Sequence, residues 1–372
     1  MRIILAPDKY KGSITGLEFC DILEPILQNH LDAEIIRLPL ADGGDGTIEV
    51  IDFYLSGETI TVQVSDPLFR PIEASFLFSD STKVAFIEMA ESSGLKLLKP
   101  EDQNCMNTTT FGTGELILHA LDKGAQHIIL GIGGSATNDC GIGMASALGY
   151  EFFDKNDNEI IPIGRNLTEV KRIDDFQVDK RLAEVKIQIA CDVKNPLYGP
   201  HGAAHIYGKQ KGASHSEIKH LDNGLRQFST VLDKYFNLST QEIEGAGAAG
   251  GMGAGTVAFL NGELIPGIEL IMQIANFETK VKGADWIITG EGRLDQQTLS
   301  GKALIGVINM AKQQKIKIAS FCGSTDLNPN EIREMGINYS STIMDKANSL
   351  EDALNDTKLY LGQLAEDFIS SL

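Results

Sequence analysis

The feature that most constrains the fold of this chain is a repeated unit: a short apolar run, a loop rich in glycine and polar residues, and a helical segment. Residues 2–6 begin the first unit, whose helix is predicted to start near Gly16. Residues 34–38 begin the second unit, whose helix is predicted from about Thr47. Two such units in succession predict the α/β fold class, with a parallel sheet that binds ligands at the carboxyl ends of its strands.

Several helix boundaries are marked by specific residues. Thr15 with Glu18, and Ser214 with Glu217, each fit a capping box, in which two side chains bind backbone N–H groups at the start of a helix. Pro25 lies inside the first of these helices and predicts a kink or a frayed second half, because proline cannot donate a backbone hydrogen bond. Three further helices are predicted for residues 268–283, about 299–313, and 350–372.

A change of pattern near Ser65 indicates a second domain. Residues 59–64 and 72–78 alternate between apolar and polar side chains and resemble paired strands. Strict alternation of strand and helix returns from residue 285. The prediction is a discontinuous α/β domain, residues 1–65 and 285–372, with a second α/β domain, residues 66–284, inserted into it.

The longest glycine-rich stretch, residues 131–149, follows the apolar run 128–130. Gly133 and Gly134 have no Cβ, so the backbone can adopt positive φ and approach a ligand closely. Backbone N–H groups that enter a helix near Asn138 would stay unpaired, and such a helix start attracts phosphate. The alternative is structural: the polar side chains cap the helix, and the glycines allow close packing.

Composition limits the possible partners. The formal net charge of −19 argues against a nucleic acid or an anionic membrane as partner, since both need a basic surface. Five cysteines without a C-x-x-C pair argue against a disulfide framework. The chain shows no signal peptide and no apolar stretch of bilayer length, which predicts a cytoplasmic location.

Charged side chains at predicted strand ends suggest phosphoryl transfer. That chemistry needs a backbone cradle, cations for charge on the phosphate, carboxylates for Mg²⁺, and a carboxylate to orient a hydroxyl group. The glycine-rich stretches 131–149 and 244–255 would supply the cradle. The charged residues are Lys9 and Lys11, Asp42 and Asp45, Asp192 and Lys194, and Glu291, Arg293 and Asp295.

Two alternatives to a kinase stay open at this point. The first alternative is an NAD(P)-dependent oxidoreductase that acts on a small hydroxy acid. Gly131, Gly133 and Ala136 satisfy the relaxed dinucleotide-binding pattern after a strand, and Glu151 lies roughly where a ribose-binding acid would be. A non-catalytic sensor of a nucleotide or sugar acid is the other. The Walker A motif is absent, because Gly301-Lys302 is followed by alanine.

Six motifs in one order resemble those of the bacterial type I glycerate kinases. The resemblance implies phosphorylation of D-glycerate by ATP and Mg²⁺, most often to 2-phosphoglycerate, with 3-phosphoglycerate as the other product. It also implies a flavodoxin-like domain interrupted by a second α/β domain. The motifs are residues 6–13 (APDKYKGS), 41–47 (ADGGDGT), 131–139 (GIGGSATND), 190–196 (ACDVKNP), 245–253 (GAGAAGGMG) and 289–295 (TGEGRLD).

We assign hypothetical catalytic roles to three of these residues. Asp192 orients the glycerate hydroxyl group, Lys11 neutralises charge on the transferred phosphoryl group, and Arg293 holds the glycerate carboxylate as a bidentate partner. Tyr10 and Lys9 stand where the family more often has Phe and Ser, so Lys11 is the safer phosphate ligand of the two lysines.

The remaining assignments concern ATP and the metal ion. The expected partners are D-glycerate and ATP, with no nucleic acid and no membrane, for a protein that is a monomer or homodimer. Nucleotide phosphate is assigned to Gly133, Gly134, Ser135, Asn138 and Lys9, and Mg²⁺ to Asp42, Asp45 and Glu291.

Overall fold

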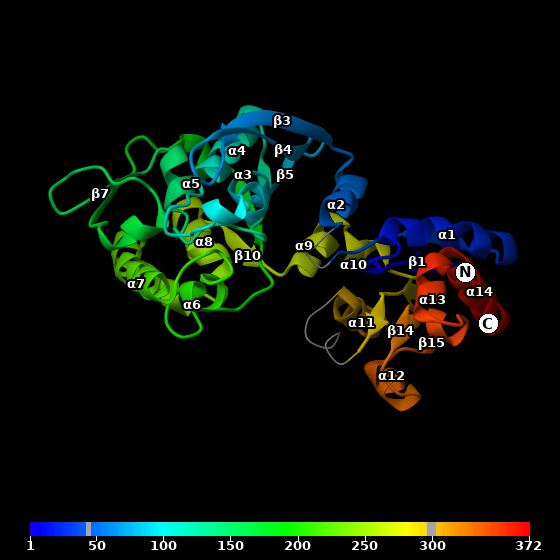
Figure 1. The fold of residues 1–372 in the computed structure, drawn as a ribbon. Helices are drawn as coiled ribbons and strands as arrows, with labels where there is room; N and C mark the ends of the chain where they lie inside the picture. The colour runs from blue at the N-terminus through cyan, green and yellow to red at the C-terminus, as the bar shows by residue number, and fades with distance from the viewer. Residues whose placement is uncertain (42–45, 296–302) are drawn as a thin grey trace. The chain divides into compact units, whose positions relative to one another are not determined.

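The computed structural model describes residues 1–41, 46–295 and 303–372. Two compact units divide the chain: Met1–Tyr54 with Gly267–Leu372, and Leu55–Pro266. Both chain ends lie in the first unit, near helices α1 (Gly16–His30) and α14 (Thr357–Ser370), as Figure 1 shows.

The described part of the first unit is built on a five-stranded sheet whose strand pairs are all parallel. Strands from the start of the chain pair with strands from its end, with Ile3 opposite Trp286 and Leu5 opposite Ile288. The parallel α/β prediction is thereby confirmed for this sheet. The order is β15 (Tyr339–Thr342), β13 (Lys317–Cys322), β11 (Trp286–Thr289), β1 (Arg2–Leu5) and β2 (Glu34–Arg37).

Helix α1 begins as predicted but continues further than predicted. Thr15 and Glu18 form the capping box, since each side chain accepts a hydrogen bond from the other residue's backbone N–H. The frayed second half expected after Pro25 is wrong, because α1 runs to His30. Leu23 and Leu27 are fully buried in the core of the unit, so packing holds the second half of the helix although Pro25 donates no backbone bond.

Two other predicted helices are each divided in two. The helix expected over 268–283 is α9 (Gly267–Ile274) and α10 (Phe277–Lys280), separated by Asn276 in the left-handed conformation with φ of 51°. The helix expected over 350–372 is α13 (Leu350–Asn355) and α14, separated by Asp356 with non-helical dihedral angles. Asn and Asp often take such positions, since their short side chains can bind the local backbone.

The other helices that begin in this unit are α2 (Thr47–Leu55), α11 (Ala303–Gln314) and α12 (Pro329–Met335). Residues 296–302, where the helix that ends at Gln314 was predicted to begin, lie outside the described residues. Two-residue strands β12 (Arg293–Leu294) and β14 (Ser324–Thr325) pair beside the main sheet.

The second unit is built on a mixed sheet of six described strands. Strands β3 and β4 pair antiparallel, as the alternating runs 59–64 and 72–78 predicted, and β5, β6, β9 and β10 pair parallel. The order is β10 (Glu263–Ile265), β9 (Lys186–Ala190), β6 (His127–Gly131), β5 (Val84–Glu88), β4 (Pro71–Ser79) and β3 (Glu58–Ser65). Strands β7 (Glu151–Phe153) and β8 (Arg172–Asp174) form a separate pair.

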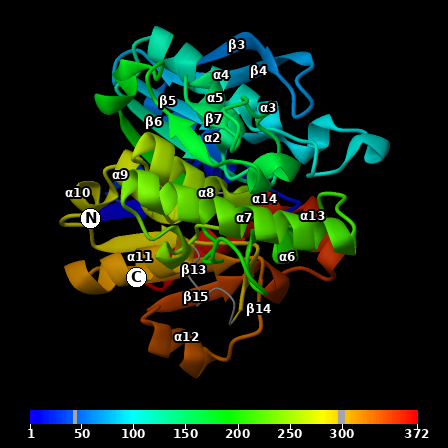
Figure 2. The ribbon, with the colours of Figure 1, turned by 90° about the vertical axis from the view of Figure 1, so that its left-hand side faces the viewer.

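The longest helix of this unit, α7 (His215–Phe236), starts at the predicted capping box of Ser214 and Glu217. It contacts α8 (Ala248–Leu260) and lies along it in Figure 2. Phe228, Phe152 and Phe259 meet in the core beneath these helices. The other helices are α3 (Ala90–Ser93), α4 (Phe111–Asp122), α5 (Ile142–Ala147) and α6 (Ala203–Tyr207).

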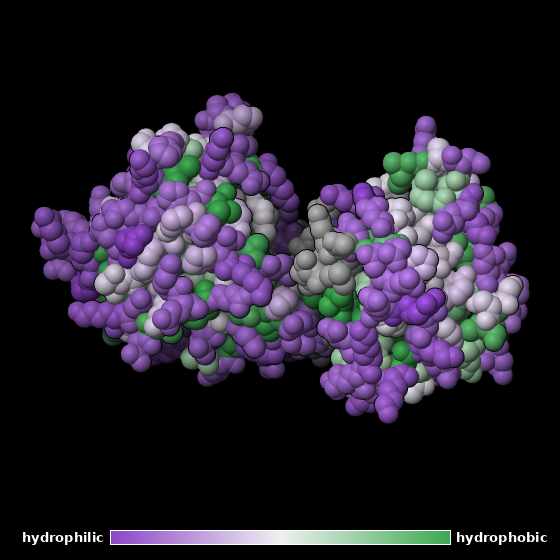
Figure 3. Space-filling view, turned by 90° about the horizontal axis from the view of Figure 1, so that it is seen from below, coloured by the Kyte–Doolittle hydropathy of each residue, from purple (hydrophilic) through white to green (hydrophobic). Residues whose placement is uncertain are grey.

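Short 3-10 helices and the surface complete the description. The 3-10 helices are Leu95–Leu97, Pro100–Asp102, Gly164–Thr168, Lys180–Ala183, Thr240–Glu242 and Ile343–Asp345. The face of the molecule seen in Figure 3 is mostly hydrophilic, with small scattered hydrophobic patches. Within the described ranges, no helix is both long enough and apolar enough to cross a bilayer.

Candidate functional site

A cavity of about 420 Å³ lies in the first unit at the carboxyl ends of β1 and β11. These two strands are neighbours, but the chain continues from β1 to β2 on one side and from β11 to β13 on the other. Their carboxyl ends therefore flank the topological switch point, the place where open α/β sheets bind ligands. The cavity is lined by the loops that follow both strands.

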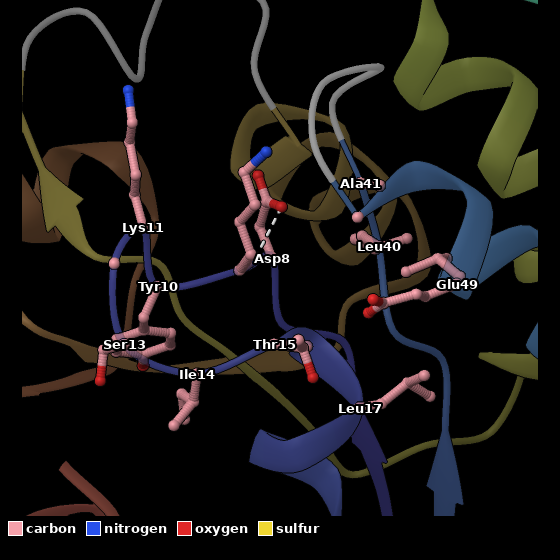
Figure 4. Close-up of a pocket in the computed structure, with 15 residues that line it drawn as sticks. Asp8, Tyr10, Lys11, Ser13, Ile14, Thr15, Leu17, Leu40, Ala41 and Glu49 are labelled. Atoms are coloured by element: carbon pink, nitrogen blue, oxygen red, sulfur yellow. Dashed lines mark hydrogen bonds between the residues drawn. The ribbon is translucent and has the colours of Figure 1, made fainter. Parts of the chain in front are cut away.

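Tyr10 anchors the loop after β1. Its ring is buried and stacks on Phe19, with 5.8 Å between the ring centres, and its hydroxyl group donates to the carbonyl oxygen of Phe321. Burial raises the pKa of Tyr10, so the hydroxyl group stays protonated and remains a donor. Figure 4 shows the Tyr10 ring directed away from the Lys11 side chain. The anchor thus leaves Lys11 exposed at the edge of the loop.

Lys11 and Lys9, both predicted to meet phosphate, line this cavity. The Lys11 ammonium group forms no ion pair with any carboxylate in the described ranges, so its charge is open to a ligand. The Lys9 backbone N–H donates to Asp8 at 2.7 Å. Both lysines also border a second hollow of about 300 Å³, whose far wall carries Leu40 and Glu49 (Figure 4).

The loop after β11 brings Glu291 and Arg293 to the same cavity. Gly290 is required before them, because a Cβ there would lie 2.0 Å from the Phe321 carbonyl oxygen. Arg293 projects outward, with 61% of its side chain exposed, and it pairs with Asp326. Its Nε also lies 3.9 Å from Asp295. The guanidinium group can therefore reach a ligand from solvent, although it already has carboxylate partners.

Of the three residues assigned to the metal ion, only Glu291 can be placed. It is buried at the wall of the cavity, and Asp8 and Asp295 line the same space. Asp42 and Asp45 lie outside the described residues. The described residues contain no group of three acidic, histidine or cysteine side chains that could hold a metal ion. Mg²⁺ bound to a nucleotide needs only one or two carboxylates besides phosphate oxygens and water, so Glu291 fits it.

The glycine-rich loop of the second unit follows β6. Because Gly131 lies opposite Ala190 of β9, this loop and the one carrying Asp192 leave the sheet at the same edge. Gly133 and Gly134 are exposed, and Gly134 has a φ of 69° that favours glycine. The backbone N–H groups of Gly133, Gly134 and Ser135 have no hydrogen-bond partner in the part of the chain that the structure describes.

The helix that follows this loop starts later than predicted. It begins at Ile142, four residues after Asn138, so the expected helix start near Asn138 is wrong. Cys140 and Gly141 both have positive φ and delay the helix. Asp139 is fully buried and accepts hydrogen bonds from the Thr110 backbone and side chain, each at 2.8 Å, and from two glycine N–H groups that follow it. Its role is to fix the loop.

The second glycine-rich stretch packs against the first. Ala249, Gly250 and Gly251 have positive φ near the start of α8. A Cβ on Gly250 would lie 2.1 Å from the Thr137 carbonyl oxygen, so only glycine fits there. The Cys140 backbone N–H donates to the Gly250 carbonyl oxygen at 3.1 Å. The stretch predicted to cradle a ligand therefore supports the first loop from behind.

Beneath the first loop lies Lys211, a residue that the sequence did not single out. It is buried, and its ammonium group donates to Ser135 Oγ at 2.6 Å and to the Thr137 carbonyl oxygen at 2.7 Å. Asn138 is also fully buried, and its side-chain amide has no hydrogen-bond partner among the described residues. No local pattern distinguishes Lys211 from a solvated lysine, since its partners are more than 70 positions away.

Asp192, assigned to orient the substrate hydroxyl group, follows β9 directly and is exposed. Two residues later, Lys194 pairs with Glu244 at 2.6 Å, and both side chains are largely exposed. Asp192 is thus accessible at the same sheet edge as the glycine-rich loop.

Comparison with known proteins agrees with these features. A family model described as the glycerate kinase family matches residues 3–372. The chain belongs to the glycerate kinase family. It is 44% identical over 366 residues to a glycerate kinase of Halalkalibacterium halodurans, covering 98% of this chain and 96% of that one. It is 42% identical over 354 residues to the glycerate 2-kinase of Escherichia coli, covering 95% and 93%.

A solved structure supports the same membership of the glycerate kinase family. The crystal structure of a Salmonella typhimurium LT2 protein assigned as glycerate kinase 2 matches with a TM-score of 0.88 and 39% identity, over 100% of this chain and 98% of that one. The resemblance drawn from the six motifs is confirmed, and the protein is a kinase by family rather than an oxidoreductase.

Proposed function

We propose that this protein transfers the γ-phosphoryl group of ATP to D-glycerate and forms 2-phosphoglycerate. The observation that carries the proposal is the convergence of Lys11, Glu291 and Arg293 on one cavity at the switch point of the first sheet, in a member of the glycerate kinase family. A relative named glycerate 2-kinase favours the 2-phospho product over 3-phosphoglycerate.

Glycerate is small and anionic, and the first unit offers it cations. Arg293 would hold the carboxylate, because a guanidinium group can donate two parallel hydrogen bonds to it. The glycerate carboxylate would then compete with Asp326 for the Arg293 guanidinium group. Lys11 would neutralise charge on the phosphoryl group in transfer, since it has no carboxylate partner in the described ranges. Asp192 would accept a hydrogen bond from the hydroxyl group that attacks phosphorus.

ATP would bind to the glycine-rich loop of the second unit. Gly133, Gly134 and Ser135 would donate their unpartnered backbone N–H groups to phosphate oxygens. Lys9 is the cation assigned to nucleotide phosphate, and the buried Asn138 would support the loop from beneath. Mg²⁺, when bound, neutralises phosphate charge, and Glu291 with Asp42 and Asp45 are the residues proposed to hold it.

We also propose that the first unit is a flavodoxin-like domain. Its strand order, β2-β1-β11-β13-β15, corresponds to the doubly wound order 2-1-3-4-5 when the strands are numbered within the unit. The second α/β domain would then be an insertion, with the boundaries at residues 65 and 285 as predictions. The compact units change at Tyr54 and Gly267. The cytoplasmic location and a monomeric or homodimeric state likewise stay predictions.

A coupled assay for ADP release tests the activity. With ATP, Mg²⁺ and D-glycerate all present, ADP should form, and leaving out glycerate or Mg²⁺ should stop it. A protein that glycerate and ATP stabilise against heat but that releases no ADP would be a sensor. A change in NADH absorbance with a hydroxy acid, without ATP, would refute the kinase assignment.

A further inference from the structure

Lys211 places a positive charge inside the second unit with no carboxylate in direct contact with it. Only 6% of the residue is exposed. Among the described residues, no carboxylate lies within 4.0 Å of its ammonium group. Two of its three N–H donors are used, by Ser135 Oγ and by the Thr137 carbonyl oxygen. A buried charge normally has a counter-charge, so an unpaired buried ammonium group is a costly feature for a fold to keep.

The segment around Lys211 is held firmly in place. Its carbonyl oxygen accepts from the Cys105 N–H at 3.0 Å, and its N–H donates to the Gly208 carbonyl oxygen at 3.1 Å. Gly212 has a φ of 84°, and a Cβ there would lie 1.8 Å from the Gln103 carbonyl oxygen. The ammonium group is therefore fixed beneath the glycine-rich loop by the backbone on both sides of the residue.

The loop above the ammonium group presents donors to solvent. The N–H groups of Gly133, Gly134 and Ser135 have no partners in the described part of the chain. A Cβ on Gly133 would meet nothing within 4 Å, so the loop is open on that side. Because Ser135 Oγ accepts a bond from Lys211, its own hydroxyl hydrogen is free to point elsewhere, and the neighbouring charge strengthens it as a donor.

We propose that Lys211 is the positioning residue of the nucleotide site: its ammonium group orients the Ser135 hydroxyl group toward a phosphate on the glycine-rich loop, and that phosphate supplies the negative charge that the ammonium group lacks in direct contact. The anion would be a nucleoside di- or triphosphate. The assignment rests on the proposed function, in which this loop binds ATP, and adds a residue to that site. Lys211 acts through Ser135 and the loop backbone and does not touch the reacting atoms.

The titration of Lys211 supports this role. Burial lowers its pKa to about 8, while Cys105 and Asp139 act in the opposite direction. Burial also raises the pKa of Cys105 to about 11 and raises that of Asp139, which four hydrogen bonds from Thr110, Gly141 and Gly143 oppose. A bound phosphate would favour the charged ammonium group, so nucleotide binding above pH 8 should take up a proton.

Calorimetric titration of the full chain with ADP, without glycerate, tests the proposal. At pH 7.5, Lys211→Met should weaken ADP binding about tenfold or more, the effect expected for a lost charge-assisted hydrogen bond. Lys209→Met removes the same charge from an exposed position two residues away and should leave binding unchanged. The KM for glycerate should not change in either variant.

The wild-type protein gives a second test that needs no substitution. Its affinity for ADP should fall about tenfold between pH 7.5 and 9.5, while Lys211→Met should show no such dependence. Ser135→Ala should weaken ADP binding and keep the pH dependence. ADP affinity within twofold of wild type in Lys211→Met, or a flat wild-type profile, would overturn the proposal. Failure of glycerate phosphorylation with normal, Lys211-dependent ADP binding would instead count against the proposed function.

Discussion

The contact between the two glycine-rich stretches makes Gly250→Ala an informative substitution. Gly250 has a φ of 78°, and the new Cβ would lie 2.1 Å from the Thr137 carbonyl oxygen and 2.6 Å from the Asn138 Cα atom. Both contacts are to backbone, so no flexible side chain can move aside. The loop that carries Thr137 and Asn138 is fixed by the hydrogen bonds of Asp139 and Lys211, so this loop resists displacement.

The expected destabilisation has two parts. An alanine in the left-handed region costs roughly 1–2 kcal/mol, partly offset by the lower entropy of the unfolded chain. Overpacking a rigid site costs about 1–3 kcal/mol more. Gly250→Ala should therefore lower the free energy of unfolding by about 2–4 kcal/mol. If the loop moves instead, the displacement of Ser135 and Thr137 should weaken the binding of ADP.

Gly124→Ala is the matched control. Gly124 lies in the same unit, has a φ of 84°, and has nothing within 4 Å of the position of its Cβ. Urea unfolding followed by circular dichroism should show a loss of only about 1 kcal/mol for this variant. Trp286, the single tryptophan, reports on the first unit separately by fluorescence. Equal destabilisation of the two variants, with equal ADP affinity, would refute the packing argument.

Three further predictions follow from the same sites. Asp192→Asn should lower kcat by orders of magnitude with nearly unchanged ADP affinity. The control Asp80→Asn, at an exposed position of the same unit, should leave both quantities unchanged. Normal turnover of Asp192→Asn would show that Asp192 takes no part in the reaction. Arg293→Lys should raise the KM for glycerate roughly tenfold, because lysine cannot make the bidentate contact, while the exposed Arg333→Lys should not; an effect on ATP alone would reassign Arg293. Burial lowers the pKa of Lys211 to about 8, so between about pH 8 and 10 the folded protein releases a proton that the unfolded chain retains. The free energy of unfolding of the wild type should therefore rise with pH relative to that of Lys211→Met. A fall in the urea midpoint of the wild type relative to the variant would contradict this.

The elements that the sequence predicted correctly depend on local signals. The capping boxes at Thr15 and Ser214 place helix starts within one turn, and short apolar runs locate the strands. Lys11 and Arg293 could be expected in one cavity because both follow strands of a parallel sheet, whose carboxyl ends share an edge. These predictions needed no knowledge of distant contacts.

The features that the sequence did not predict depend on distant contacts. The helix after the glycine-rich loop starts late because Cys140 and Gly141 have positive φ, and the residue that fixes this turn, Asp139, binds Thr110, 29 positions away. The Lys211 ammonium group is hydrogen-bonded to Ser135, 76 positions away, and no residue near Lys211 in the sequence indicates that it is buried. Pro25 predicted a kink or a frayed second half of α1, but the helix runs to His30 and Leu27 packs in the core.

Phosphorus-31 NMR of a single reaction distinguishes phosphoryl transfer to glycerate from simple hydrolysis of ATP. With ATP, Mg²⁺ and D-glycerate, the signals of ADP and of one new phosphomonoester should grow together in equal amounts. Phosphate on the C2 oxygen couples to one proton and gives a doublet, whereas phosphate on C3 couples to two protons and gives a triplet. We expect the doublet; free inorganic phosphate without a phosphomonoester, or no change in ATP, would refute the proposed phosphoryl transfer.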